Sequence, residues 1–318
     1  MFNNITPDKI PDVIYHYCSL DTFSKIVQNR TIRLSNIFKM NDYSEVLHVL
    51  EPLQRMLEKE FDNEPFSFCY MNVSGKDAFI HLVADIKKDI EADKYLTYIA
   101  CFSETDDDLY QWKAYGDDGK GVAIGLDGKR LFELAKYYIG NRCPLYLTDV
   151  SYAPDEQMDF LKIAVVPRTF DTLKKAQENG NVKNGKCTYE AMIRIMLSSY
   201  ISAILLAAVR YKHHSYMAEK EWRLCLNTTI CSTWPEEECM NFTGSKGYPK
   251  MEFRINANKL ISFFDLQLRD FASNIIKKII LGPKSTIGID DPDLRLFLKM
   301  NGFNIERGAI KRSGIPYS

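Results

Sequence analysis

Strand-like and helix-like patterns are distributed unevenly along this chain of 318 residues. Short runs of β-branched and aromatic residues lie before residue 153 and again after residue 219, whereas residues 154 to 210 show helical spacing. Two groups of strands separated by helical sequence predict a mixed α/β (α+β) fold around one hydrophobic core. We therefore expect a single domain over residues 1–318, with helical insertions at about 45–93 and 154–212.

The expected elements follow from apolar periodicity and from residues that begin or end helices. Ser19, for example, is placed to cap a helix directly after a strand that contains His16. We expect strands over residues 13–17, 31–34, 95–103, 120–126, 145–152, 222–227, 251–255 and 275–281. We expect helices over residues 20–28, 45–61, 76–93, 109–115, 129–138 and 290–300, and a polar loop over 35–44.

Bulk properties exclude several classes of protein. The 41 lysines and arginines nearly balance the 42 aspartates and glutamates, so the chain is no polycation, although a local basic cleft remains compatible with this balance. The eight cysteines are scattered without zinc-like spacing, which favours reduced thiols and no metal. The most apolar run, residues 195–209, is shorter than the roughly 20 residues that span a bilayer, and indicates a buried helix. Since residues 1–11 also lack the apolar core of a signal peptide, we expect a cytoplasmic protein without membrane contact.

Familiar catalytic and nucleotide-binding motifs do not fit. The glycine-rich segment 116–121 has neither phosphate-loop nor dinucleotide spacing, and its two aspartates would repel phosphate, so a hairpin-like turn is favoured. No serine lies in a nucleophile elbow. His213 and His214 are adjacent, and neighbouring side chains on a regular element point in different directions, which argues against a metal clamp.

Three groups of polar and aromatic residues remain as candidates. His16 lies between two tyrosines on an expected strand and faces the side opposite to theirs, and it is either a ligand contact or a satisfied, partly buried histidine. Ser103 ends the expected strand 95–103. Trp112 and Tyr115 follow it on one face of a helix, where core packing explains them as well as ligand stacking does.

The third group is the charged segment from Glu219 to Arg223. Alternation along an expected strand places Glu219, Glu221 and Arg223 on one side. Such a set forms either a hydrogen-bonding site or an exposed ion pair.

Taken together, these segments resemble a bacterial family known as domain of unknown function 2971. The resemblance runs from Tyr15 to about Tyr317 and rests on an ordered series of short motifs. They are Tyr15-His16-Tyr17, Asn41-Asp42 with Glu45, Cys101-Phe102-Ser103, Trp112 with Tyr115, Gly121 before an alternating strand, Glu219-Lys220-Glu221-Trp222-Arg223, and Leu281-Gly282-Pro283-Lys284.

The chain is also distantly similar to the ADP-ribosyltransferase fold. The similarity lies in the opening strand and helix, and in the order of a histidine, a serine and a late glutamate, here His16, Ser103, and Glu219 or Glu221. It implies a central, mainly antiparallel split sheet and an enzyme that takes NAD as a substrate and needs no metal.

The resemblance also implies roles for single residues. Glu221 or Glu219 would be the catalytic carboxylate, because cleavage of the nicotinamide glycosidic bond builds positive charge on the ribose. His16 would hydrogen-bond the adenosine ribose, and Ser103 would brace the glutamate or the nicotinamide amide. The other expected contacts to the nucleotide are Tyr17 or Trp112 as stacking partners, Tyr115 and Arg223.

The resemblance leaves several functions open. The leading hypothesis is an ADP-ribosyltransferase-like enzyme that modifies a protein or nucleic acid in bacterial anti-phage defence or toxin action. The same site would serve an NAD glycohydrolase if water reached the ribose, or a non-catalytic nucleotide-sensing or protein-binding module if no bond were broken. Family members often carry a basic residue at the position of His16, and Lys220 could pair with either glutamate. Both points weigh against the assignment of ADP-ribosyltransferase roles to His16 and the glutamates.

Overall fold

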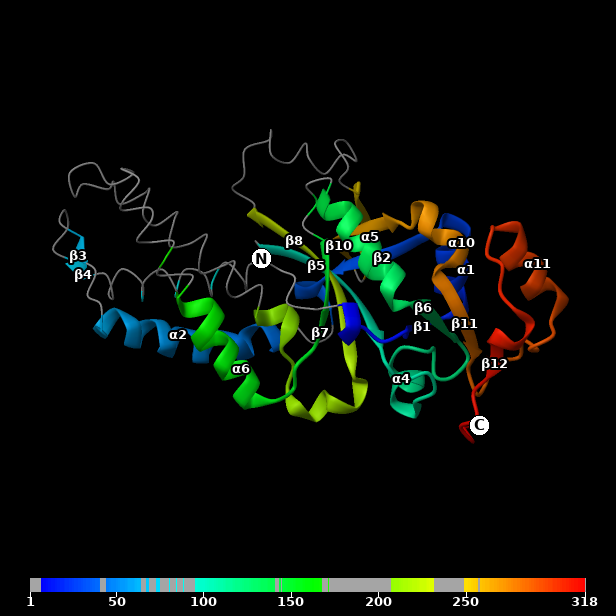
Figure 1. Cartoon of the computed structure of the whole chain (residues 1–318), viewed down its shortest axis with the longest axis horizontal. Helices are drawn as coiled ribbons and strands as arrows, with labels where there is room; N and C mark the ends of the chain where they lie inside the picture. The colour runs from blue at the N-terminus through cyan, green and yellow to red at the C-terminus, as the bar shows by residue number, and fades with distance from the viewer. Residues whose placement is uncertain are drawn as a thin grey trace.

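A ten-stranded sheet occupies the middle of the molecule in the computed structural model. Helices α2 (Ser44–Asn63) and α6 (Pro154–Phe160) lie at one end, and α11 (Pro292–Met300) lies at the other (Figure 1). The structure describes residues 7–40, 44–63, 67–68, 73–74, 80, 84, 88, 95–140, 143, 145–167, 171, 207–231, 249–256 and 258–317.

The sheet is mixed but mainly antiparallel. Its order is β12-β11-β6-β1-β5-β2-β10-β9, with β8 pairing with both β5 and β7, and only the β11–β12 pair is parallel among the described pairs. The strands are β1 (Val13–Cys18), β2 (Thr31–Asn36), β5 (Tyr95–Ser103), β6 (Val122–Asp127), β7 (Leu145–Asp149), β8 (Glu221–Cys231), β9 (Met251–Asn256), β10 (Lys259–Gln267), β11 (Ile276–Leu281) and β12 (Ile310–Arg312). Strands β3 (Ser67–Phe68) and β4 (Val73–Ser74) form a separate pair.

The sheet divides at β5. One edge of β5 is paired with β8 along its whole length, from Tyr95 to Ser103. The opposite edge is shared, because β1 pairs at Ser103 and β2 pairs at Tyr98 and Ile99. Neither β1 nor β2 pairs with residues 100–102 of β5. The two neighbouring strands therefore part here and leave a gap beside β5.

Helices cover the sheet and connect its strands. The α-helices whose bounds lie within the described residues include α1 (Leu20–Asn29), α2, α4 (Leu109–Ala114), α5 (Gly128–Gly140), α6, α10 (Ala272–Ile275) and α11. Short 3-10 helices are η1 (Pro7–Lys9), η2 (Ile37–Lys39), η4 (His214–Glu219), η6 (Arg269–Phe271) and η7 (Arg307–Ala309), and η3 (Leu161–Val165) is a π-helix. The Ser19 hydroxyl accepts from the Thr22 amide at the start of α1, so the predicted cap is confirmed.

Packing differs on the two faces of β1. Even-numbered residues such as Ile14 and Cys18 belong to the main core, which also contains buried residues of α1, α5 and α11. Tyr15 and Tyr17 belong to a smaller cluster on the other face, with Trp112 and Ala123. The predicted strand-then-helix unit is therefore confirmed, and it fixes the direction in which each aromatic residue points.

The mixed α/β prediction is confirmed, and several details are corrected. The sequence prediction omitted β10, which pairs with β9 across a turn where Asn258 has a φ of 62°. Residues 35 and 36 extend β2 instead of beginning a loop, because they pair with β5. Segment 116–121 is a turn but no hairpin, since it joins α4 to β6, and β6 pairs with β1 and β11.

Parts of both predicted helical insertions lie outside the described residues. Helix α2 confirms the prediction over 45–61, and residues 80, 84 and 88 of the expected helix 76–93 are helical. In the second insertion, α6, η3 and residues 207–210 are helical, whereas residues 172–206 are outside the described chain. Among the described helices, none combines the length and apolar character needed to cross a bilayer.

Gly121 shows how tightly β6 approaches β1. A methyl group at Gly121 would lie 2.1 Å from the carbonyl oxygen of Cys18. We therefore expect Gly121→Ala to lower the free energy of unfolding by at least about 1–3 kcal/mol, the usual cost of overpacking. Gly308→Ala is the matched control, because a methyl group there meets nothing within 4 Å. Denaturant unfolding of both variants tests this, and equal stabilities would contradict it.

Candidate functional site

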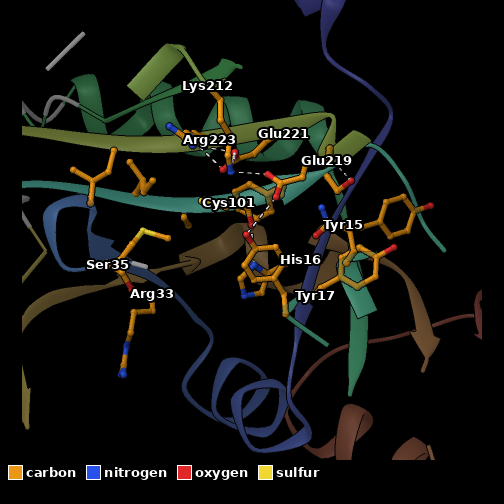
Figure 2. A pocket seen from close by; sticks show the side chains of 18 residues that line it. Tyr15, His16, Tyr17, Arg33, Ser35, Cys101, Lys212, Glu219, Glu221 and Arg223 are labelled. Atoms are coloured by element: carbon orange, nitrogen blue, oxygen red, sulfur yellow. Dashed lines mark hydrogen bonds and ion pairs between the residues drawn. The ribbon is translucent and has the colours of Figure 1, made fainter. Parts of the chain in front are cut away.

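A pocket lies at the gap beside β5. Its cavity volume is about 220 Å³, and it is lined from β1, β2, β5, β8, α4 and η4, segments that are far apart in the sequence. Figure 2 shows side chains from these elements converging on one space. The division of the sheet thus creates the pocket, because β5 has no strand partner on this edge at residues 100–102.

His16 reaches the gap from β1. Its Nδ1 lies 3.0 Å from the carbonyl oxygen of Cys101 (Figure 2). Because a carbonyl oxygen can only accept, Nδ1 carries the proton and donates. Burial lowers the pKa of His16, so the ring is neutral at pH 7 and Nε2 is a hydrogen-bond acceptor. The His16 side chain thus supplies the hydrogen bond that the Cys101 carbonyl would otherwise receive from the backbone of a neighbouring strand.

Ser103 connects β5 to the segment that carries the glutamates. It stands opposite Tyr15 on one side and Glu221 on the other. Its hydroxyl donates to the Glu219 carbonyl oxygen at 2.6 Å and accepts from the Thr105 amide. This contact is made to the backbone of Glu219 and not to its carboxylate, so the expected bracing role of Ser103 stays a prediction.

Four buried charged side chains form one end of the pocket. Lys212 Nζ lies 2.6 Å from Glu219 Oε2 and 3.4 Å from Glu221 Oε2. The Arg223 guanidinium meets Glu221 with two bonds, Nε to Oε1 at 2.9 Å and Nη2 to Oε2 at 3.0 Å. All four side chains are at most 6% exposed. The exposed ion pair considered from the sequence is thus wrong, and a buried network takes its place.

The backbone explains how both glutamates reach the network. Glu221 and Arg223 are two residues apart on β8 and share a face. Glu219 is not on the strand, as the alternation had suggested, but ends η4. Lys220 between them has a φ of 44°, a left-handed conformation that turns the chain from η4 into β8. Lys220 itself is exposed, and Lys212 contacts the glutamates instead.

The network holds Glu221 ionised and its neighbours Cys101 and Tyr115 neutral. Burial raises the pKa of Glu221, but the charges of Arg223 and Lys212 outweigh it and bring the pKa down to about 2. Burial, and then the charge of Glu221, raise the pKa of the Cys101 thiol well above its usual value. Burial and the Glu219 charge also raise the pKa of Tyr115. At neutral pH, Cys101 and Tyr115 are therefore protonated beside charged carboxylates.

The aromatic candidates divide into two groups. Tyr17 and Tyr115 line the pocket, and the Tyr115 hydroxyl donates to Glu219 Oε1 at 3.4 Å. Trp112 does not line it, since it is fully buried behind Tyr17, with their ring centroids 4.8 Å apart. Its Nε1 donates to Asp107. Trp112 therefore supports Tyr17 and is not placed to stack on a ligand in this pocket.

We expect stability to fall in acid as Glu221 is protonated. Its pKa is about 2 in the folded chain and 4.5 ordinarily, so its ionisation favours folding above pH 4.5, and this contribution is lost as the pH falls toward 2. The loss is on the order of 3 kcal/mol. Denaturant unfolding between pH 6 and 3 measures about 2 kcal/mol of this loss, because the remainder occurs below pH 3. Glu221→Gln should flatten this dependence, and an unchanged slope in that variant would contradict the assignment.

Comparison with known proteins gives one match. Residues 111–224 match a family model described as a protein of unknown function (DUF2971), which supports the resemblance found in the sequence. The matched segment runs from Gln111 in α4 to Leu224 in β8 and includes the buried network. No curated protein and no solved structure matches the chain significantly. The similarity to the ADP-ribosyltransferase fold stays a prediction.

Some pocket residues were not identified from the sequence. Lys212 follows an apolar run and precedes two histidines, and no spacing links it to the glutamates. Gln111 also lines the pocket and was not among the candidates. Cys101 lines it as well, but the sequence had indicated it only as part of a family motif and not as a site residue. Among the described residues, no group of three or more His, Cys, Asp or Glu side chains could hold a metal ion.

Proposed function

We propose that this protein cleaves the nicotinamide glycosidic bond of NAD and transfers ADP-ribose to a macromolecular acceptor. The observation that carries the proposal is that His16, Ser103 and the Glu219–Glu221 pair, far apart in the sequence, line one pocket. A hydrogen-bond acceptor, a bracing hydroxyl and a buried carboxylate suit a reaction that builds positive charge on a ribose.

The two glutamates take different roles in this proposal. Glu221 receives two bonds from Arg223 and one from Lys212, so its carboxylate is engaged in holding the network together. Glu219 meets Lys212 through Oε2, and its Oε1 accepts a long bond from the pocket-lining Tyr115. A ribose hydroxyl can replace so long a contact at little cost. We therefore assign the catalytic carboxylate to Glu219 and a positioning role to Glu221.

The reaction balances without an oxidant or a metal. The bond between ribose C1′ and the nicotinamide nitrogen breaks, and its electron pair stays on that nitrogen, which neutralises the ring. A nucleophile on the acceptor bonds to C1′ and releases its proton to water. Glu219 accepts a hydrogen bond from a ribose hydroxyl, and its negative charge stabilises the positive charge that develops on the sugar.

Incubation with radiolabelled NAD and a cell lysate tests the proposal. We expect release of free nicotinamide together with label on a macromolecule. Free ADP-ribose without labelled macromolecule would instead identify an NAD glycohydrolase. If no nicotinamide is released, and NAD also leaves the melting temperature unchanged, the proposal is wrong, because selective binding must stabilise the native state.

A further inference from the structure

We propose that the pocket recognises the nicotinamide ribose end of its substrate alone, so that a nicotinamide nucleoside is cleaved nearly as well as the dinucleotide. This inference rests on the proposed function and specifies its substrate class. It follows from the size of the pocket, from the pairing of its cations and from the different character of its two ends.

The size of the pocket favours part of a dinucleotide. Its cavity volume is about 220 Å³, below the roughly 300–1,000 Å³ of typical ligand pockets. It extends along β5 from Ile99 to Ser103, a distance of about 13 Å at roughly 3.3 Å per residue. This space suits one ring and one ribose, and leaves the remaining part of NAD outside.

The cations of the pocket are each paired with a carboxylate. Lys212 contacts both glutamates, and Arg223 binds Glu221 with two bonds. Arg33, at the β2 side, binds Asp265 with two bonds of 2.8 Å and lies over the ring of Phe263. In Figure 2 the head of Arg33 extends away from the charged end. Because each of these cations already faces a carboxylate that offsets its charge, the lining offers little net attraction to a diphosphate, which disfavours it.

The two ends of the pocket match the two parts of a nicotinamide nucleoside. Ile37 of η2 and Ile99 of β5 supply an apolar wall beside the paired Arg33, whereas Glu219 lies at the charged end beside Ser103. During cleavage the ring loses its positive charge and the ribose gains it. An apolar wall for the ring and a carboxylate for the sugar therefore stabilise the transition state more than the bound substrate, which is the requirement for catalysis.

The experiment compares kcat/KM for nicotinamide release from NAD and from nicotinamide riboside, with the wild-type chain. We expect the two values to agree within about tenfold, a difference of 1.4 kcal/mol or less. Inorganic pyrophosphate at millimolar concentration should not inhibit. If NAD is cleaved and the riboside is more than about tenfold poorer, or if pyrophosphate competes with NAD, this inference is wrong while the proposed function stands. If neither compound is cleaved, the proposed function fails with it.

Arg33 provides a further test of the same inference. If its guanidinium held the diphosphate, Arg33→Gln would lower kcat/KM for NAD much more than for the riboside. We expect the ratio of the two values to stay within about threefold of the wild-type ratio, because a loss of folded protein affects both substrates equally. A tenfold fall in the ratio would place the diphosphate at Arg33 and overturn the inference.

Discussion

Glu219→Gln is expected to lower kcat for nicotinamide release from NAD by about 100- to 1,000-fold, with little change in KM. The size of the effect follows from losing one preorganised electrostatic contact to the charge that develops in the transition state. Glutamine keeps the size and shape of the side chain, but it removes the charge and replaces one acceptor oxygen by an NH2 donor. Lys212 retains Glu221 as a partner, but the buried network then holds two cations and one carboxylate, so this variant is expected to be less stable as well. Steady-state measurement of nicotinamide release tests this expectation.

The control for this variant is Glu306→Gln. Glu306 is exposed and precedes the short helix η7, far along the chain from the pocket-lining residues. It undergoes the same chemical change and should leave both kcat and the melting temperature unchanged. If Glu219→Gln keeps more than a tenth of wild-type kcat while remaining folded, Glu219 is not the catalytic carboxylate.

Arg223→Met is expected to reduce the free energy of unfolding by about 3–5 kcal/mol. The substitution leaves the carboxylate of Glu221 buried without its two guanidinium bonds, and removing one partner of a buried pair has this cost. It also leaves the carbonyl oxygens of Ala208 and Val209 without the donor Nη1. Denaturant unfolding at neutral pH measures the loss.

Two comparisons make the Arg223 result specific. Arg254→Met, on the exposed strand β9, should change stability by no more than about 0.5 kcal/mol. The double variant Glu221→Leu with Arg223→Met should recover part of the loss, since it removes the unpaired charge. A loss below about 1 kcal/mol in the single variant would mean that Glu221 and Arg223 are not a buried ion pair.

Local sequence patterns predicted many of the strands and helices, because apolar periodicity and capping residues determine these elements within a few residues. Strand β5 was predicted at its observed bounds, and the Ser19 cap placed the start of α1. Strand β10 was not predicted, although buried and less buried positions recur along it. The extension of β2 to Asn36 depends on pairing with β5, and no propensity within residues 35–44 reveals such a partner.

Part of the candidate site was also predicted, because the positions of residues along a strand follow from local alternation. His16 and Ser103 could be placed at strand positions from short segments, and alternation correctly put Glu221 and Arg223 on one face. Glu219 reaches them by another route, through the left-handed backbone at Lys220. The contacts of Lys212 could not be predicted from the sequence. They depend on the path of the chain through η4, which brings Glu219 and Glu221 back to Lys212.

The sequence by itself determined the types of element, the direction of side chains along each strand and the polar residues available for chemistry. These depend on spacing within a few residues. Only the tertiary structure decided that β1 and β2 part beside β5, that His16 reaches the Cys101 carbonyl in the gap, and that two glutamates share a buried lysine. The first two depend on contacts between distant segments, and the third depends on the path of the chain through η4 between Lys212 and Glu221. No apolar or polar spacing reveals these geometries.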